Sequence, residues 1–265
     1  MPNLIDIGAN LTNSRFKSDL PNVIARAQAQ GVHKMIVTGT SLQASKEALA
    51  LTEQFPTRLT CTSGVHPHDA SEWNPTTAAE ITALAQHASV VAVGECGLDF
   101  FRDISPRDQQ IHCYEAQLHI AAQVQKPVFL HQRDAHDEFL AILKQHRNPL
   151  PNAVVHCFTG TAQQAFDYLD QDCHIGITGW LCDPRRGDDL RQAVKSIPLD
   201  KLMIETDSPY LLPKDLSSNL TKPKSNRNEP AFLPHILNTL ADILNHPPQL
   251  LSERLTANTC AFFAL

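Results

Sequence analysis

The sequence predicts an α/β fold in which eight parallel strands, each followed by a helix, form a closed (β/α)₈ or TIM barrel. Short apolar runs rich in Val and Ile alternate with segments of helical composition, which is typical of buried parallel strands and their crossover helices. The length of 265 residues suits one barrel, so we expect a single domain over residues 1–265. An open doubly wound sheet is the alternative, and the regular spacing of the polar residues that end the runs favours the barrel.

The apolar runs have the length expected of buried strands, and turn or helix signals separate them. Gly31 ends the first helical segment, and Asn74 and Pro75 precede the third. The expected strands are Asn3–Gly8, Lys34–Thr38, Leu59–Val65, Val90–Glu95, Pro127–His131, Ala153–Phe158, Cys173–Thr178 and Leu202–Thr206. The expected helices are Leu20–Gln30, Ser41–Gln54, Thr76–His87, Pro106–Gln125, Asp134–Gln145, Ala162–Leu169, Arg186–Val194, Ala231–Leu244 and Pro248–Phe263.

A polar residue ends each run, and most of these residues can bind a metal or carry a proton. In a barrel the carboxyl ends of all strands converge on one face, where active sites are built. We therefore expect one site from the strand-end residues, which are Asn10, Thr38, His66, Glu95, His131, His156, Thr178 and Asp207.

Composition and charge exclude several classes of protein. The formal net charge of −6 argues against a protein that coats nucleic acid by charge alone. The seven cysteines form no C-x-x-C pair, which excludes a zinc ribbon and a thioredoxin motif. The N-terminus has no signal-peptide pattern, and no apolar run is long enough to span a bilayer. We expect a cytoplasmic protein, a monomer, with no membrane partner.

Glu95, His131 and His156 each follow an apolar run and together predict a divalent-metal site. One carboxylate and two imidazoles from three different strands are a credible ligand set. Each residue taken alone could instead be a solvated, capping or core residue. Asp99 is a second carboxylate candidate, although it could pair with Arg102.

Two further motifs supply candidate catalytic groups. Glu205 and Asp207 follow the eighth run, and a carboxylate there could act as a general base or as an additional ligand, or Asp207 could cap a helix. His66 and His68 flank Pro67 after the third run, where alternation could place both rings on one side.

The motifs GVHPHD, GECGLDF, LHQRDAHD, HCFTG and ETDSPYL occur in this order, and the set resembles the TatD family of metal-dependent deoxyribonucleases. IDIGANLT near the start and NEPAFL near the end extend the resemblance over essentially the whole chain. The resemblance implies a TIM barrel of the metal-dependent hydrolase superfamily. It also implies magnesium-dependent 3′→5′ exonuclease action, with single-stranded DNA and RNA as the substrates.

Residue by residue, the resemblance places the family's metal ligands on Glu95, His131 and His156, and its acidic strand-eight residue on Asp207. One departure concerns the first strand, where many members carry a D-x-H-x-H motif whose two histidines bind a second metal. The matching stretch here runs from Asp6 through Gly8 to Asn10 and has no histidine, as in the TatD branch itself. A two-metal mechanism is therefore in doubt.

For a nuclease we expect Asp207 to accept the proton of the attacking water, with Glu205 positioning it and with His66 or Arg133 stabilising charge on the phosphate. We expect Arg133, His68 and Asn10 at the substrate. Base stacking could involve Phe101 and Trp180. The cations available to a nucleic-acid strand are Arg185, Arg186, Lys222, Lys224 and Arg227, any of which could be ordinary loop charge.

Two other functions stay open at this point. The same metal site could hydrolyse another ester or an amide, such as an aminoacyl-nucleic acid, because a fold does not fix a substrate. The second is a binding protein without catalytic activity, in which the missing first-strand histidines would mark the decay of an ancestral active site.

Overall fold

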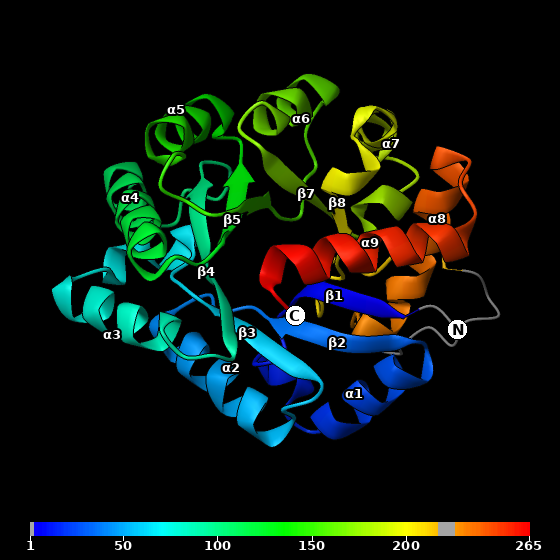
Figure 1. Cartoon of the computed structure of the whole chain (residues 1–265), viewed down its shortest axis with the longest axis horizontal. Helices are drawn as coiled ribbons and strands as arrows, with labels where there is room; N and C mark the ends of the chain where they lie inside the picture. Colours follow the sequence, from blue (N-terminus) through cyan, green and yellow to red (C-terminus); the bar gives the residue numbers. More distant parts are fainter. Residues whose placement is uncertain (1–2, 217–225) are drawn as a thin grey trace.

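The eight expected strands form one parallel sheet, in the order β1 to β8, which is rolled into a barrel (Figure 1). The computed structural model describes residues 3–216 and 226–265. The barrel closes through backbone bonds between β1 and the chain just after β8. The Asp207 amide donates to the Gly8 carbonyl at 2.8 Å, and the Asn10 amide donates to the Ser208 carbonyl at 2.8 Å. The prediction of a TIM barrel is confirmed.

Strands and α-helices alternate along the chain up to β8, and two α-helices follow β8 among the residues that the structure describes. The strands are β1 (Leu4–Ala9), β2 (Val32–Val37), β3 (Leu59–Ser63), β4 (Val90–Asp99), β5 (Val128–Arg133), β6 (Ala153–Val155), β7 (Cys173–Ile177) and β8 (Leu202–Ile204). The helices are α1 (Leu20–Ala29), α2 (Leu42–Gln54), α3 (Pro75–Ala85), α4 (Arg107–Val124), α5 (His136–His146), α6 (Ala162–Leu169), α7 (Asp188–Ala193), α8 (Leu233–Leu244) and α9 (Pro248–Phe263).

β4 and β5 run further than the apolar runs predict. Glu95 and His131 were expected as the last residues of their strands, but both lie inside a ladder in which Gly97 pairs with His131 and Asp99 with Arg133. Gly97 has φ +143°, and a Cβ built on it would lie 1.9 Å from the His131 carbonyl oxygen. Because only glycine tolerates this approach, it carries the ladder past Glu95, where the pattern of apolar residues had already stopped.

The barrel interior is filled by apolar side chains and sealed at one end by the C-terminal helix. α9 lies across this end (Figure 1, red) and contributes two phenylalanines to the interior cluster. The opposite end, where the carboxyl ends of the strands meet, carries the polar residues. The interior cluster comprises Ile7, Ile36, Val91, Ala92, Phe129, Val154, Met203, Phe262 and Phe263.

Between the barrel and its ring of helices lies a second, larger apolar layer. In it the ring of Tyr114 on α4 stacks on Phe139 of α5, with centroids 5.1 Å apart. Tyr168 on α6 meets the edge of Phe139 at 5.7 Å. All three side chains are fully buried. This aromatic contact ties three successive helices to the outside of the strands.

Within residues 3–216 and 226–265, no helix is both long and apolar enough to cross a membrane.

Phe139 provides a test of this outer layer. Phe139→Ala should lower the free energy of unfolding by about 3–5 kcal/mol, because it leaves a cavity among buried aromatic rings. The measurement is chemical denaturation followed by circular dichroism. Phe166→Ala, the same change on α6 at a side chain that is 43% exposed, is the control and should cost under about 1 kcal/mol. Equal losses in the two variants would contradict the packing described here.

Candidate active site

Three imidazoles converge on one carboxylate oxygen at the carboxyl end of the barrel. His156 Nε2 lies 2.7 Å from Glu95 Oε1, His131 Nδ1 lies 2.9 Å from it, and His66 Nε2 lies 3.4 Å from it. Glu95 belongs to β4 and His131 to β5, while His66 and His156 lie in the segments that follow β3 and β6. Glu95 and His156 are each 4% exposed. Four residues distant in sequence thus form one cluster, in which Glu95 and His156 are buried and His66 and His131 are partly exposed.

The charges of this cluster are mutually dependent. Burial alone would raise the pKa of Glu95, but the charges and hydrogen bonds of the imidazoles outweigh it and hold the pKa well below its usual range. Burial opposes a charge on His156, yet Glu95 and Glu205 raise the pKa of this imidazole well above its usual value. His66 differs, because burial lowers its pKa to about 3 despite the charge of Glu95. The cluster therefore contains an ionised carboxylate and a neutral His66.

A second carboxylate, Asp99, lies at the end of β4 on the same side as Glu95. Its Oδ2 is 2.7 Å from His68 Nε2 and 3.7 Å from His131 Nε2. Its Oδ1 accepts hydrogen bonds from the backbone amides of Phe101 and Arg102 at 3.0 and 2.8 Å. Asp99 thus joins His68 to the cluster, and its bond to Arg102 involves the backbone amide of that residue.

The donor atoms of this cluster fit a divalent cation. One ligand atom each from His66, Glu95 and His131 lie within 4.8 Å of one another. His131 Nε2 is buried and makes no hydrogen bond to any described residue, which leaves a polar atom that an ion would satisfy. His156 Nδ1 lies 3.3 Å from Glu205 Oε2, and this contact directs its Nε2 toward Glu95. A carboxylate behind an imidazole is the usual support of a metal-binding histidine.

Asp207 lies beside the cluster, on the backbone segment that closes the barrel. Its Oδ1 accepts a hydrogen bond from Asn10 Nδ2 at 2.9 Å, and its φ of +52° turns the chain away from β8. Burial raises the pKa of Asp207 to about 7, and the charges of Glu95 and Glu205 add to this effect against the attraction of His156. A carboxylate that titrates near neutral pH is suited to proton transfer.

Glu205 is fully buried inside the barrel, where it faces β1 and His156. Its Oε1 accepts a hydrogen bond from the Cys157 amide. A Cβ built on Gly8 would lie 2.2 Å from Glu205 Oε2, so the carboxylate occupies the space that any side chain at position 8 would need. A side chain at position 8 would therefore require the Glu205 carboxylate to move.

Of the expected substrate-binding groups, Arg133 lies with its guanidinium 3.9 Å from the ring centroid of Phe101. Phe101 is 56% exposed. Beside this pair is a cavity of about 620 Å³ between the segments that follow β5 and β6. It is lined by Phe100, Gln132, Arg133, Asp134, Ala135, His136, Asp137, Glu138, Thr159, Gly160, Thr161, Gln164 and Asp189. An exposed aromatic ring backed by a cation suits a base of a single strand.

The remaining expected cations have different surroundings. Arg186 lies over the ring of Trp180 at 4.2 Å and pairs with Asp183, in an exposed segment that also carries Arg185. Arg227 is engaged in ion pairs with Asp19 and Glu229, at 2.8 and 2.7 Å, and is not free for a nucleic acid. Lys222 and Lys224 lie outside the described residues.

Sequence reasoning missed two buried glutamines of α4 that hold the loops of the site. Gln117 Oε1 accepts from the Val65 amide at 2.8 Å, and its Nε2 donates to the Val65 carbonyl at 2.9 Å, immediately before His66. Gln110 Oε1 accepts from the Asp99 amide at 2.9 Å. Their spacing of two helical turns on the apolar face of α4 was the available signal, since a polar residue on such a face needs a partner.

Asp6, in the first-strand motif, has a structural role that the sequence pattern does not indicate. Its Oδ1 accepts from the amides of Gly8 and Thr206, at 3.3 and 2.9 Å, and its Oδ2 accepts from Thr206 Oγ1 at 2.6 Å. The carboxylate fixes the start of the segment that holds Asp207 against β1.

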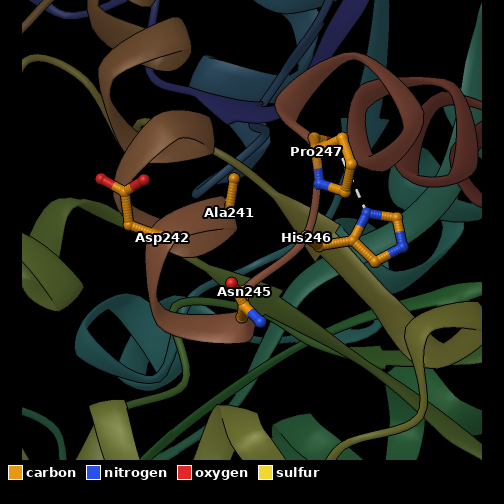
Figure 2. A pocket seen from close by; sticks show the side chains of 5 residues that line it. All are labelled: Ala241, Asp242, Asn245, His246 and Pro247. Atoms are coloured by element: carbon orange, nitrogen blue, oxygen red, sulfur yellow. Dashed lines mark hydrogen bonds between the residues drawn. The ribbon is translucent and has the colours of Figure 1, made fainter.

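A separate recess lies on the connection between α8 and α9 (Figure 2). Its side chains come from Ala241, Asp242, Asn245, His246 and Pro247, and His246 Nδ1 faces the Pro247 carbonyl at 3.4 Å. None of these residues belongs to the strand ends, and the recess has no set of converging donors like that around Glu95. The chemistry of the molecule is concentrated at the carboxyl end of the barrel.

The comparisons with known proteins agree with this geometry. Residues 5–264 match the family model described as TatD related DNase. The chain is 51% identical over 262 residues to the 3′-5′ ssDNA/RNA exonuclease TatD of Citrobacter rodentium, covering 99% of this chain and 98% of the relative. It is 49% identical over 260 residues to the protein of the same name from Salmonella typhimurium, with 98% of each covered.

Among solved structures, the TatD homolog YjjV from Escherichia coli K12 superimposes with a TM-score of 0.90 at 29% identity, covering 99% of this chain and 98% of that one. Two observations lead to one conclusion. The barrel brings a carboxylate and three imidazoles together at one end, and the family model matches nearly every residue. The chain belongs to the TatD family of DNases.

Proposed function

We propose that this chain is a 3′→5′ exonuclease that hydrolyses phosphodiester bonds of single-stranded DNA and RNA with the help of a divalent cation, magnesium. The observation that carries the proposal is the buried Glu95 surrounded by three imidazoles at the open end of the barrel. The names of the relatives from Citrobacter rodentium and Salmonella typhimurium support the substrate and the polarity.

In this proposal Glu95, His131 and His156 hold the cation, and Asp207 is a further ligand or the base. His66 forms, with Glu95 and His131, the group of donor atoms that lie within 4.8 Å of one another. The hydrogen bonds of the two imidazoles nevertheless favour His156 over His66 as a metal ligand. His66 Nδ1 accepts from the His68 amide at 3.1 Å, so the neutral ring carries its proton on Nε2 and has no lone pair there. His156 has the opposite arrangement, because its Nδ1 faces Glu205 and leaves Nε2 for a metal.

The bound cation would neutralise charge on the phosphate and lower the pKa of the attacking water. Asp207, which Asn10 holds in position by a hydrogen bond, accepts the proton of that water. His66 donates from Nε2 and stabilises charge on the phosphate oxygens. Glu205 is fully buried, so it acts by orienting His156 and does not touch substrate. His68, which Asp99 contacts at 2.7 Å, is our candidate for a substrate-binding group beside the cluster.

For the strand itself we propose that a terminal base stacks on Phe101, with Arg133 beneath that ring, and that the backbone passes toward Trp180 and Arg186. Phe101 follows β4 and Arg133 ends β5, while Trp180 and Arg186 follow β7, and each pair combines a π-face with a cation. Few phosphates are contacted in this arrangement, which agrees with the net charge of −6.

The metal ligands can be tested by Glu95→Gln and His131→Ala. Each should abolish binding of Mg²⁺ and Mn²⁺ in isothermal titration and reduce nuclease activity by about 10²-fold or more. His119→Ala, an exposed imidazole on α4, is the control and should retain both properties. EDTA should stop the wild-type reaction and added Mg²⁺ should restore it. Unchanged metal affinity in Glu95→Gln would refute the assignment, as would full activity in EDTA.

The role of Asp207 can be tested by Asp207→Asn. The amide keeps a hydrogen-bonding group beside Asn10 but cannot accept a proton from water, so kcat should fall by about 10²-fold or more with the fold intact. Asp170→Asn, at the exposed end of α6, is the matched control. Initial rates and circular dichroism spectra are the measurements. A kcat of Asp207→Asn within a few-fold of the wild type would remove Asp207 from the mechanism.

Substrate form gives a third test. A single strand or an unpaired 3′ end should be cut faster than a blunt duplex, because the cluster lies in the recess of a barrel and opening a duplex costs a few kcal/mol per unstacked step. The comparison uses one end-labelled strand alone, in a blunt duplex, and in a duplex with a 3′ overhang. Equal rates on the first two, or cuts within a closed circle, would contradict the proposed exonuclease.

A further inference from the structure

A thiol, an imidazole and a carboxylate meet outside the cluster around Glu95. Cys182 ends the short 3-10 helix η3 (Gly179–Cys182) that follows β7, Asp215 lies in the segment after β8, and His235 lies in the first turn of α8. One ligand atom from each of the three lies within 4.8 Å of the other two. No residue of this group takes part in the proposed nuclease mechanism.

The contacts within the group are close and converge on one point. His235 Nε2 lies 2.6 Å from Asp215 Oδ1. The Cys182 thiol lies 3.5 Å from Thr239 Oγ1, and Thr239 follows His235 by one turn on the same face of α8. Cys182 is 2% exposed, whereas Asp215 is exposed to solvent. The group therefore has a buried sulfur and an open side through which an ion can enter.

The fold brings these segments together for reasons unrelated to the group. β7 and β8 are neighbours in the barrel, so the chain segments that leave them lie side by side. Arg191 Nη1 donates to the Leu181 carbonyl at 2.9 Å, which holds η3 in place beside Cys182. Leu216, next to Asp215, is buried, and so is Leu233 at the start of α8. The three ligand-bearing positions are thus anchored by their neighbours and are not free to separate.

We propose that Cys182, Asp215 and His235 form a second metal site of the zinc type, separate from the catalytic centre. Thiolate and imidazole ligands select zinc and similar transition metals, whereas magnesium prefers oxygen ligands and retains its waters. Three protein ligands leave the fourth tetrahedral position to a water or to Thr239 Oγ1. On binding, a sulfur–metal bond replaces the S–H bond of Cys182, and the proton is released to solvent.

A metal held here would join the segments after β7 and β8 to the start of α8. All three lie at the end of the barrel that carries the cluster around Glu95, so the ion would stabilise the rim of that end without entering the reaction. Because a metal that binds only the folded chain stabilises it, zinc should raise the melting temperature through these three residues.

Cobalt(II) titration tests this proposal, because a thiolate ligand gives cobalt a charge-transfer absorption in the near ultraviolet that imidazoles and carboxylates do not give. The full-length protein, in a reducing buffer that does not bind metals, should develop this absorption with one equivalent per chain. Cys182→Ser should lose it, while Cys260→Ser, a half-buried free cysteine of α9, should keep it. Zinc should displace the cobalt and abolish the absorption.

Asp215→Asn and His235→Ala extend the test to positions where a folding defect is less of a concern than at the buried Cys182. Each should weaken the apparent cobalt affinity by at least about 10-fold. Losing a residue that only supports a metal ligand already costs about 10-fold or more, so losing a ligand itself should cost no less. In the Glu95→Gln background, which removes a ligand of the proposed catalytic cation, zinc should raise the melting temperature, and adding His235→Ala should abolish that rise.

Glu95→Gln should keep the absorption, which separates failure of this inference from failure of the proposed nuclease. The inference is overturned if the wild type shows no near-ultraviolet absorption with excess cobalt. It is also overturned if folded Cys182→Ser retains that absorption, or if Asp215→Asn and His235→Ala bind cobalt as tightly as the wild type.

Discussion

The burial of one negative charge, that of Glu95, is the constraint on which the functional end of this molecule depends. A carboxylate removed from water is costly unless it is paired and hydrogen-bonded. Here the surrounding imidazoles keep it ionised. They approach the carboxylate from different sides, so they come from three different strands or the segments that follow them. The barrel meets this requirement, since it aims the ends of eight strands at a common axis.

Around that carboxylate lies a layer of residues that fix backbone. Gln117 holds the backbone before His66, Gln110 holds Asp99, and Asp6 holds Thr206 next to Asp207. Each is a buried polar side chain whose hydrogen-bonding groups are used within the protein, so removing it would leave unsatisfied partners in the interior. The segments that carry His66 and Asp207 are thus held in place because side chains of α4 and β1 bind their peptide groups.

The fold could be predicted from the sequence because strand burial and helix composition are local signals. The gathering of Glu95, His131 and His156 could be anticipated as well, since a barrel brings together the residues at or near the carboxyl ends of its strands. The extension of β4 and β5 could not, because Gly97 gives no apolar signal and the extension depends on a backbone approach between two strands. The tautomer that separates His66 from His156 depends on the His68 amide and on Glu205, contacts that only the assembled structure creates.

The contact between Gly8 and Glu205 also restricts how this site can change over generations. A side chain at position 8 would need the space of the Glu205 carboxylate, so Glu205 would have to shift away from its present contacts with His156 and the Cys157 amide. Shortening Glu205 first would clear the space but would take away the partner of His156. Replacements at the two positions should therefore have non-additive effects, so the tolerance of position 8 to a larger side chain depends on which residue occupies position 205.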